Sequence, residues 1–309
     1  MMTAEPSEHA VPADIPPELV WHNSFDRFTA EGDDPFQAVS RLHDMPPVFW
    51  ASDASFGRPG WVLTRHDVIS EAFIDFEHFS AERPGMIAEL LGEPVLLNPI
   101  EIDPPRHHHY RRILNPFFTP SAVRTFDEPV RQICRELIAK FADKGGCEFI
   151  DDFAVPFPSY VFLDLMGMPR AMLDQFIDWQ NLLMRSPDPA KRVEAARAIY
   201  AYLKQHMAAQ QAEPSNDFLA AMVNGAVDGR PIDYYELMGM FYVLYVGGLD
   251  TVYSTIGWIM RYLAMNPELQ QRLRADPALL PQAVEEFCRA FSVVVTHRSV
   301  RDDFVFHGV

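Results

Sequence analysis

One long apolar segment, residues 233–265, constrains the fold of this chain most strongly. Its pattern predicts a single helix that opens with a capping box at residues 233–236. The sequence GGLDT occupies residues 247–251 at its centre, and each glycine costs a helix roughly 1 kcal/mol relative to alanine. An acid and a hydroxyl on so apolar a segment indicate a reaction site beside an open spot. The ordinary alternative is that Thr251 bonds back to its own helix and Asp250 pairs with a core arginine.

Composition limits the class of protein and its partners. With 48% hydrophobic and 22% charged residues, the 309-residue chain is expected to be globular. The net charge of −17 argues against nucleic acid and anionic membrane surfaces as partners. Three cysteines without pairing or metal-binding spacing suit a reducing compartment, so we expect a cytoplasmic protein. We also expect it to be a monomer. Residues 1–17 read as a flexible leader without signal-peptide features, and residues 18–309 as a single domain.

A membrane span is the alternative for part of the apolar segment. Residues 237–262 are long enough to cross a bilayer. However, Asp250 stands in the middle of that stretch, where a charge costs ~2.5–3.5 kcal/mol. No cluster of Lys or Arg flanks it. The sequence therefore favours a helix buried in a protein core.

The rest of the chain predicts a mainly helical fold with a small sheet. A hairpin is expected over residues 47–51 and 60–64, and a strand around 304–306. From residue 106 onward, helical patterns separated by Pro and Gly follow one another, without a βαβ alternation. The apolar, Pro- and Gly-rich loop 83–105 is expected to line a cavity or act as a lid; the alternative is simple packing on the core.

Two further clusters of polar residues accompany the central segment. His107 and Arg111 are four residues apart at a helix start, so both can face one carboxylate-bearing ligand. A solvated basic turn is the alternative, and three successive histidines at 107–109 cannot all face one metal. Glu286 and Arg289 form a Glu-x-x-Arg step, which alone is typical of an ordinary surface pair.

Taken together, these three clusters, their order and their flanks resemble the cytochrome P450 family, and most closely its soluble bacterial class that includes camphor hydroxylase. The resemblance runs from about Trp21 to the last residue. It implies a mainly α cytochrome P450 fold, a helical bundle with a long central helix and a small N-terminal β-sheet. It also implies haem b (iron protoporphyrin IX) as cofactor and monooxygenase activity.

The resemblance also implies roles for individual residues. Haem would be held by His107, Arg111 and Arg298, against the surface opened by Gly247 and Gly248. Asp250 would relay protons, and Thr251 would take part in oxygen activation. Glu286 and Arg289 would hold the core beneath the haem. The residues expected to line the substrate pocket are Met86, Val95, Val243, Val246 and Val294.

The sequence departs from the family at the metal ligand. The family binds iron through a cysteine in a loop of the form Phe-x-x-Gly-x-x-x-Cys-x-Gly, and this loop is absent before Val309. Cys134, Cys147 and Cys288 lack the surroundings that favour a thiolate. We therefore expect a chain truncated at its C-terminus, without the axial metal ligand. A catalytically inactive remnant is the alternative function.

The expected reaction is hydroxylation of a small, apolar, terpenoid-like substrate with O2 and electrons from a [2Fe-2S] ferredoxin. Residues 84–102 contain no tyrosine to hold a camphor ketone. The ferredoxin is expected to dock at Arg106, His108 and Arg112, which are locally basic on an acidic chain. A terpene cyclase is a remote alternative, since the acids at 151–152 lack the third acid that its magnesium site needs.

Overall fold

The computed structural model describes residues 11–24, 34–55, 58–82 and 85–309. Contacts divide the chain into two compact units. Unit 1 comprises the chain up to Ser80 together with Ser299–Val309, and unit 2 comprises Ala81–Arg298. Residues 1–10 of the predicted leader lie outside the described residues. That residues 18–309 act as one domain stays a prediction.

Unit 1 contains the small sheet that the sequence predicts. Strand β1 (Val20–Ser24) pairs in parallel with β2 (Val48–Ser55), which pairs antiparallel with β3 (Arg58–Leu63). Trp50 lies opposite Trp61, and the two rings meet edge to face at 5.4 Å. The predicted hairpin is therefore confirmed. The other elements of this unit are η1 (Pro17–Leu19), α2 (Pro35–Ser40), η2 (Arg41–Asp44), α3 (His66–Ile74), β4 (Phe79–Ser80) and β7 (Ser299–Val300).

The predicted strand around residues 304–306 is wrong. The strand that forms is β7, which pairs antiparallel with β4. Phe304 instead stacks on His78 with ring centroids 4.4 Å apart, and Phe306 packs edge to face on Phe79 at 4.8 Å. These side chains are held by ring contacts within unit 1, so their apolar character does not require a strand.

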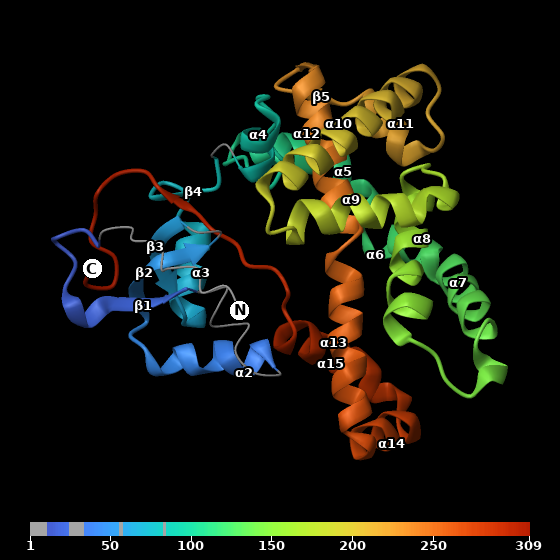
Figure 1. The fold of residues 1–309 in the computed structure, drawn as a ribbon. Coiled ribbons are helices and arrows are strands. Elements are labelled where there is room, and N and C mark those ends of the chain that lie inside the picture. Colours follow the sequence, from blue (N-terminus) through green and yellow to red (C-terminus); the bar gives the residue numbers. More distant parts are fainter. Residues whose placement is uncertain (1–10, 25–33, 56–57, 83–84) are drawn as a thin grey trace. The chain divides into compact units, whose positions relative to one another are not determined.

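Unit 2 is almost entirely helical, as predicted (Figure 1). Its helices before the central segment are α4 (Met86–Leu91), α5 (Arg106–Leu114), η3 (Asn115–Phe118), α6 (Pro120–Val123), η4 (Arg124–Phe126), α7 (Asp127–Ala139), η5 (Ala142–Lys144), the π-turn η6 (Ile150–Ala154), α8 (Pro156–Leu165), η7 (Arg170–Met172), α9 (Leu173–Arg185), α10 (Pro189–Ala212) and α11 (Asp217–Val223). The hairpin β5 (Ala226–Val227) and β6 (Arg230–Pro231) follows, and then α12 (Tyr234–Gly248), α13 (Thr251–Met265), α14 (Pro267–Ala275), η8 (Pro277–Leu279) and α15 (Leu280–Ala290).

The core of unit 2 surrounds α12. Eight of its residues are buried, including Phe241, Tyr242 and Tyr245. Tyr242 donates a hydrogen bond to the Ala196 carbonyl of α10, and Tyr245 donates one to the Phe176 carbonyl of α9. A helix that is apolar on nearly every side is typical of a core position. In the described part of the chain, no helix is both long and apolar enough to cross a bilayer.

The central segment forms two helices where the sequence predicted one. The capping box at Asp233 and Glu236 is present, but α12 ends at Gly248 and α13 begins at Thr251. Figure 1 shows the two helices following one another, with the break between them. Two glycines weaken the helix at this point, and Asp250 leaves the helical conformation with φ −137° and ψ −52°. The break turns the Asp250 side chain toward α9.

The loop before α5 is more ordered than predicted. The sequence predicts a loop over residues 83–105, but residues 86–91 form the short helix α4. Residues 83–84 lie outside the described residues. Arg192 of α10 donates from Nη2 to the Met86 sulfur at 2.6 Å, so this short helix is held on α10.

Candidate functional site

The candidate site begins with an open face at the end of α12. Val243 and Val246 are half-buried there, and Gly247 is exposed. A Cβ added at Gly247 would meet no atom within 4 Å. Val243, Val246 and Gly247 share one side of α12, because residues three and four apart are neighbours on a helix. The structure thus brings two predicted pocket residues beside an open spot.

The second glycine has a different environment. A Cβ at Gly248 would lie 2.2 Å from Cδ2 of Phe162, a buried ring on α8. Gly248 therefore permits close packing of two helices, whereas Gly247 leaves space open. One pair of adjacent glycines has two separate roles.

Replacing Gly248 by alanine is expected to lower the free energy of unfolding by about 1–3 kcal/mol, because the Phe162 ring cannot move without disturbing the core. The matched variant Gly247→Ala should leave stability unchanged or raise it by about 1 kcal/mol through helix propensity. Urea unfolding of both variants checks this. Equal effects at the two positions would contradict the structure.

Asp250 forms an ion pair with Arg185, the last residue of α9. Arg185 Nη2 lies 2.5 Å from Asp250 Oδ1. Burial lowers the pKa of Arg185, but the hydrogen bond and charge of Asp250 raise it above its ordinary value. Burial and a hydrogen bond to Asp250 raise the pKa of Tyr253 to about 12. Both partners keep their protons at neutral pH, so both donate to Asp250, and the Ser254 hydroxyl donates to the same carboxylate at 3.5 Å.

A cavity of about 660 Å³ reaches this cluster. Arg185 and Tyr253 line it, together with Lys140 at the end of α7. Its lining also includes four acids of η6 and α9, which are Asp151, Asp152, Asp174 and Asp178. The carboxylate of Asp250 is thus linked through its two partners to a polar, water-accessible space.

Thr251 opens α13 beside the acid. Its Oγ1 donates to the Gly247 carbonyl at 2.8 Å. This is the local bond that sequence reasoning gave as the ordinary alternative. The same bond fixes the hydroxyl next to the open position at Gly247.

The basic residues of α5 lie at its N-terminal end. His107 is half-buried and Arg111, one turn later, is exposed. Burial lowers the pKa of His107, and the charges of His108 and Arg111 lower it further. Burial also lowers the pKa of Arg298, which the Asp103 carboxylate just before α5 partly offsets. The structure therefore brings Arg298 near the start of this helix.

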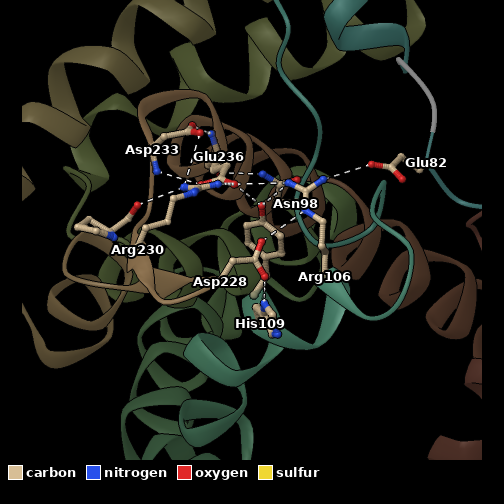
Figure 2. Close-up of polar contacts among 10 residues, drawn as sticks. Glu82, Asn98, Arg106, His109, Asp228, Arg230, Asp233 and Glu236 are labelled. Atoms are coloured by element: carbon tan, nitrogen blue, oxygen red, sulfur yellow. Dashed lines mark hydrogen bonds and ion pairs between the residues drawn. The ribbon is translucent and has the colours of Figure 1, made fainter.

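Arg106 belongs to a polar cluster around the buried Glu236 at the start of α12 (Figure 2). Glu236 accepts from the Tyr110 hydroxyl at 2.8 Å, and from Arg230 Nη2 at 2.7 Å and Nη1 at 2.8 Å. Arg106 lies 3.5 Å from the same carboxylate and 3.4 Å from Glu82. Burial alone would raise the pKa of Glu236, but these partners lower it to about 2. Arg106 thus forms ion pairs with two carboxylates, which partly neutralise its positive charge.

The remaining predicted site residues have varied surroundings. Val95 is fully buried in the core of unit 2, whereas Val294 is 54% exposed. Glu286 and Arg289 form an exposed ion pair on α15 with 2.7 Å between Oε1 and Nη2. His108 and Arg112 are exposed on α5, as docking residues must be. Their assigned roles stay predictions.

Known proteins resemble this chain over nearly its whole length. A probable cytochrome P450 127A1 from Sinorhizobium fredii is 36% identical over 308 residues, which cover 97% of this chain and 73% of that protein. The chain belongs to the cytochrome P450 family. The family model for cytochrome P450 matches residues 163–285. A steroid C26-monooxygenase of Mycobacterium tuberculosis is 29% identical over 70% of this chain, which spans 60% of that protein.

Solved structures agree with this cytochrome P450 fold. The crystal structures of CYP101J2 and CYP101C1 each match with a TM-score of 0.82, at 29% and 28% identity. Each match covers 97% of this chain and 75% of the other. Cytochrome P450 proteins bind haem, iron protoporphyrin IX.

The cationic residues around α5 are of the kind that a haem propionate needs. Within the described residues, neither His107 nor Arg111 forms an ion pair with a carboxylate. A propionate between them would relieve the repulsion that lowers the His107 pKa. At Gly247, a side-chain atom at the Cβ position would meet no other atom within 4 Å. His107, Arg111 and Arg298 would hold the haem propionates.

No described cysteine fits the axial position. Cys134 is half-buried on α7, and burial raises the pKa of its thiol, the opposite of what a thiolate ligand needs. Cys147 and Cys288 are exposed, and neither belongs to α5, α12 or α13. In the described residues, no group of three or more His, Cys, Asp or Glu side chains is arranged to hold a metal ion.

Sequence reasoning missed Arg185 and Tyr253. A buried acid predicts a cationic partner of some kind, but nothing in the local sequence points from Asp250 to the end of α9, 65 residues earlier. Tyr253 lies three residues after Asp250, and helical spacing could have placed it beside the acid.

Proposed function

We propose that this protein is a haem-dependent monooxygenase that hydroxylates a small, apolar, terpenoid-like substrate with O2. The observation that carries the proposal is the open apolar face of α12 at Gly247, next to the paired carboxylate of Asp250. When bound, haem supplies the iron at which dioxygen is reduced and the substrate is oxidised. The protein must then bind the substrate, exclude water and deliver protons.

Proton delivery is assigned to Asp250. Its carboxylate accepts from Arg185 and Tyr253, which line the cavity of about 660 Å³. A water molecule of the cavity would protonate the Asp250 carboxylate as its ion pair with Arg185 opens, and the hydroxide left behind would be neutralised from bulk solvent. Rotation of the protonated side chain would then bring this proton toward the open face, where the carboxyl group releases it. Thr251, whose hydroxyl is held by the Gly247 carbonyl, is the group that receives and orients it there.

The substrate pocket is assigned to Val243 and Val246 on α12 and to the loop before α5. Both valines are half-buried beside the open position. Leu96 and Leu97 of the loop are partly buried against the core of the same unit. Apolar walls of this kind favour a substrate of terpenoid character. The absence of tyrosine from residues 84–102 argues against a camphor ketone as ligand.

Visible spectroscopy of the protein purified from its own gene tests this function. A haem Soret band is expected, and a shift to the long wavelength of thiolate ligation in the reduced carbon monoxide complex would support the active monooxygenase. A haem band without that shift would favour the inactive remnant. The absence of any haem band would contradict the proposal.

We also propose that a [2Fe-2S] ferredoxin reduces the protein at the exposed residues His108 and Arg112, and that the protein works as a cytoplasmic monomer. Arg106 contributes less, because Glu82 and Glu236 share its charge. An acidic partner is attracted to this basic end of α5.

Reversing the charge in Arg112→Glu should slow electron transfer about tenfold at low salt, since charged patches raise association rates. The matched control is Arg124→Glu, which reverses an exposed arginine on η4. Stopped-flow reduction with a ferredoxin at several salt concentrations measures the effect. Equal reduction rates for Arg112→Glu and Arg124→Glu would contradict this docking site.

A further inference from the structure

The loop before α5 touches α12 through its backbone at Gly239. A Cβ at this glycine would lie 1.8 Å from the Leu96 carbonyl oxygen and 3.3 Å from Asn98 Nδ2. No side chain fits there unless the loop backbone moves, because the nearest atom is not a flexible side-chain end. Gly239 therefore sets how closely residues 96–98 lie on α12.

Two hydrogen bonds hold the same stretch of loop on the helix. Asn98 Nδ2 donates to the Glu236 carbonyl at 3.0 Å, and the Asn98 side chain is buried (Figure 2). The Tyr235 hydroxyl donates to Glu93 Oε2 at 2.9 Å. These bonds lie on either side of Leu96, so the loop is fixed before and after its contact with Gly239.

The loop is also braced within itself. The Leu97 N–H donates to Glu101 Oε2 at 2.7 Å, and the Glu101 N–H donates to the Leu97 carbonyl at 3.1 Å. Residues 93–101 thus behave as one piece. A displacement at Leu96 moves the neighbouring leucines with it.

Gly239 shares a helix face with the residues assigned to the pocket. Residues 239, 243 and 246 are spaced by four and then three, so they form one stripe along α12. The loop covers one end of this stripe, at Gly239. The other end of the stripe, at Gly247, is open. Leu96 and Leu97 are therefore placed one turn from Val243.

We propose that Gly239 is a specificity-determining, positioning residue: it lets the loop backbone lie against α12 and so fixes the height of the pocket roof over Val243 and Val246. The proposal rests on the proposed monooxygenase function, because it takes this stripe as the substrate site. A side chain at position 239 lifts the roof and admits larger ligands. The native glycine therefore selects for small apolar substrates.

Two measurements on Gly239→Ala test the proposal. Amide hydrogen exchange of Val95 and Leu97 reports loop contact without any need for haem, and it should become about tenfold faster. Spectral titration of the haem-loaded protein with imidazole and 4-phenylimidazole reports pocket size. The Kd for 4-phenylimidazole divided by the Kd for imidazole should fall roughly tenfold. A change of one methyl group in an apolar pocket can have an effect of this size.

Gly257→Ala is the matched control, because this glycine of α13 would place its Cβ 2.9 Å only from the Ile150 methyl end, which can move. Asn98→Ala removes a loop bond without adding bulk, and it replaces Gly239→Ala if that variant does not fold. It should shift both readouts in the same direction.

Unchanged exchange together with an unchanged Kd ratio would overturn the proposal. Faster exchange with an unchanged ratio would also overturn it, since the loop would then not roof the pocket, while the monooxygenase function would stand. Failure of the wild-type protein to take up haem or bind imidazole would instead contradict the proposed function itself.

Discussion

Asp250→Asn is expected to lower kcat about 100-fold, the lower end of what a positioned acid–base group contributes. Asparagine keeps the shape of the side chain and can still accept from Arg185, but it cannot take up or release a proton. Because the substitution leaves Val243 and Val246 untouched, the KM for the apolar substrate should stay close to the wild-type value. The solvent isotope effect on kcat should rise as proton delivery becomes limiting.

The matched control is Asp178→Asn, which makes the same chemical change at an acid of the same cavity. Product formation per electron consumed should be measured with both variants. Asp178→Asn should retain the wild-type rate. A wild-type rate in Asp250→Asn would mean that protons reach the open face by another route.

Glu236→Gln should lower the free energy of unfolding by about 3 kcal/mol at pH 7. Glu236 is 7% exposed, and its pKa falls from 4.5 to about 2 in the folded protein; each unit corresponds to about 1.4 kcal/mol. Glutamine would also direct an N–H group at the guanidinium of Arg230. A depressed carboxyl pKa stabilises the fold above the unfolded-state pKa and loses that contribution as pH falls. The difference between the two proteins should therefore shrink from pH 5 toward pH 2.

Chemical unfolding at several pH values measures this effect. Glu128→Gln serves as control, because Glu128 pairs with Arg135 on an exposed surface, with 72% of the glutamate side chain accessible. That variant should change stability by no more than about 0.5 kcal/mol. A pH-independent loss in Glu236→Gln would show that shape, and not charge, holds the start of α12.

Much of the fold follows from patterns that are local in sequence. The capping box at residues 233–236 and the apolar run after it place α12, and alternating apolar residues around a turn place the hairpin of β2 and β3. The helix break at Leu249 was not predicted, because glycine cost alone does not decide between a bend and a break. Tertiary contacts decide it, through the pair of Asp250 with Arg185.

The candidate site was predictable only in part. Gly247, Asp250 and Thr251 stand out because polar and small residues interrupt an apolar helix. Their partners do not, since Arg185 and Gly239 look ordinary in the sequence and gain meaning from contacts with distant segments. The two adjacent glycines are alike in sequence, and only packing against Phe162 separates their roles.

The central claim is that haem lies on the open face of α12 at Gly247, and haem titration of Gly247→Leu tests it most directly. The leucine fills space that is empty in the protein alone, so the fold should be retained, as circular dichroism can verify. Soret absorbance should then show haem affinity at least about tenfold weaker than in the wild type, while the control Val252→Leu, which places a leucine on an exposed side of α13, binds normally. Equal haem affinity in Gly247→Leu and wild type would contradict the account.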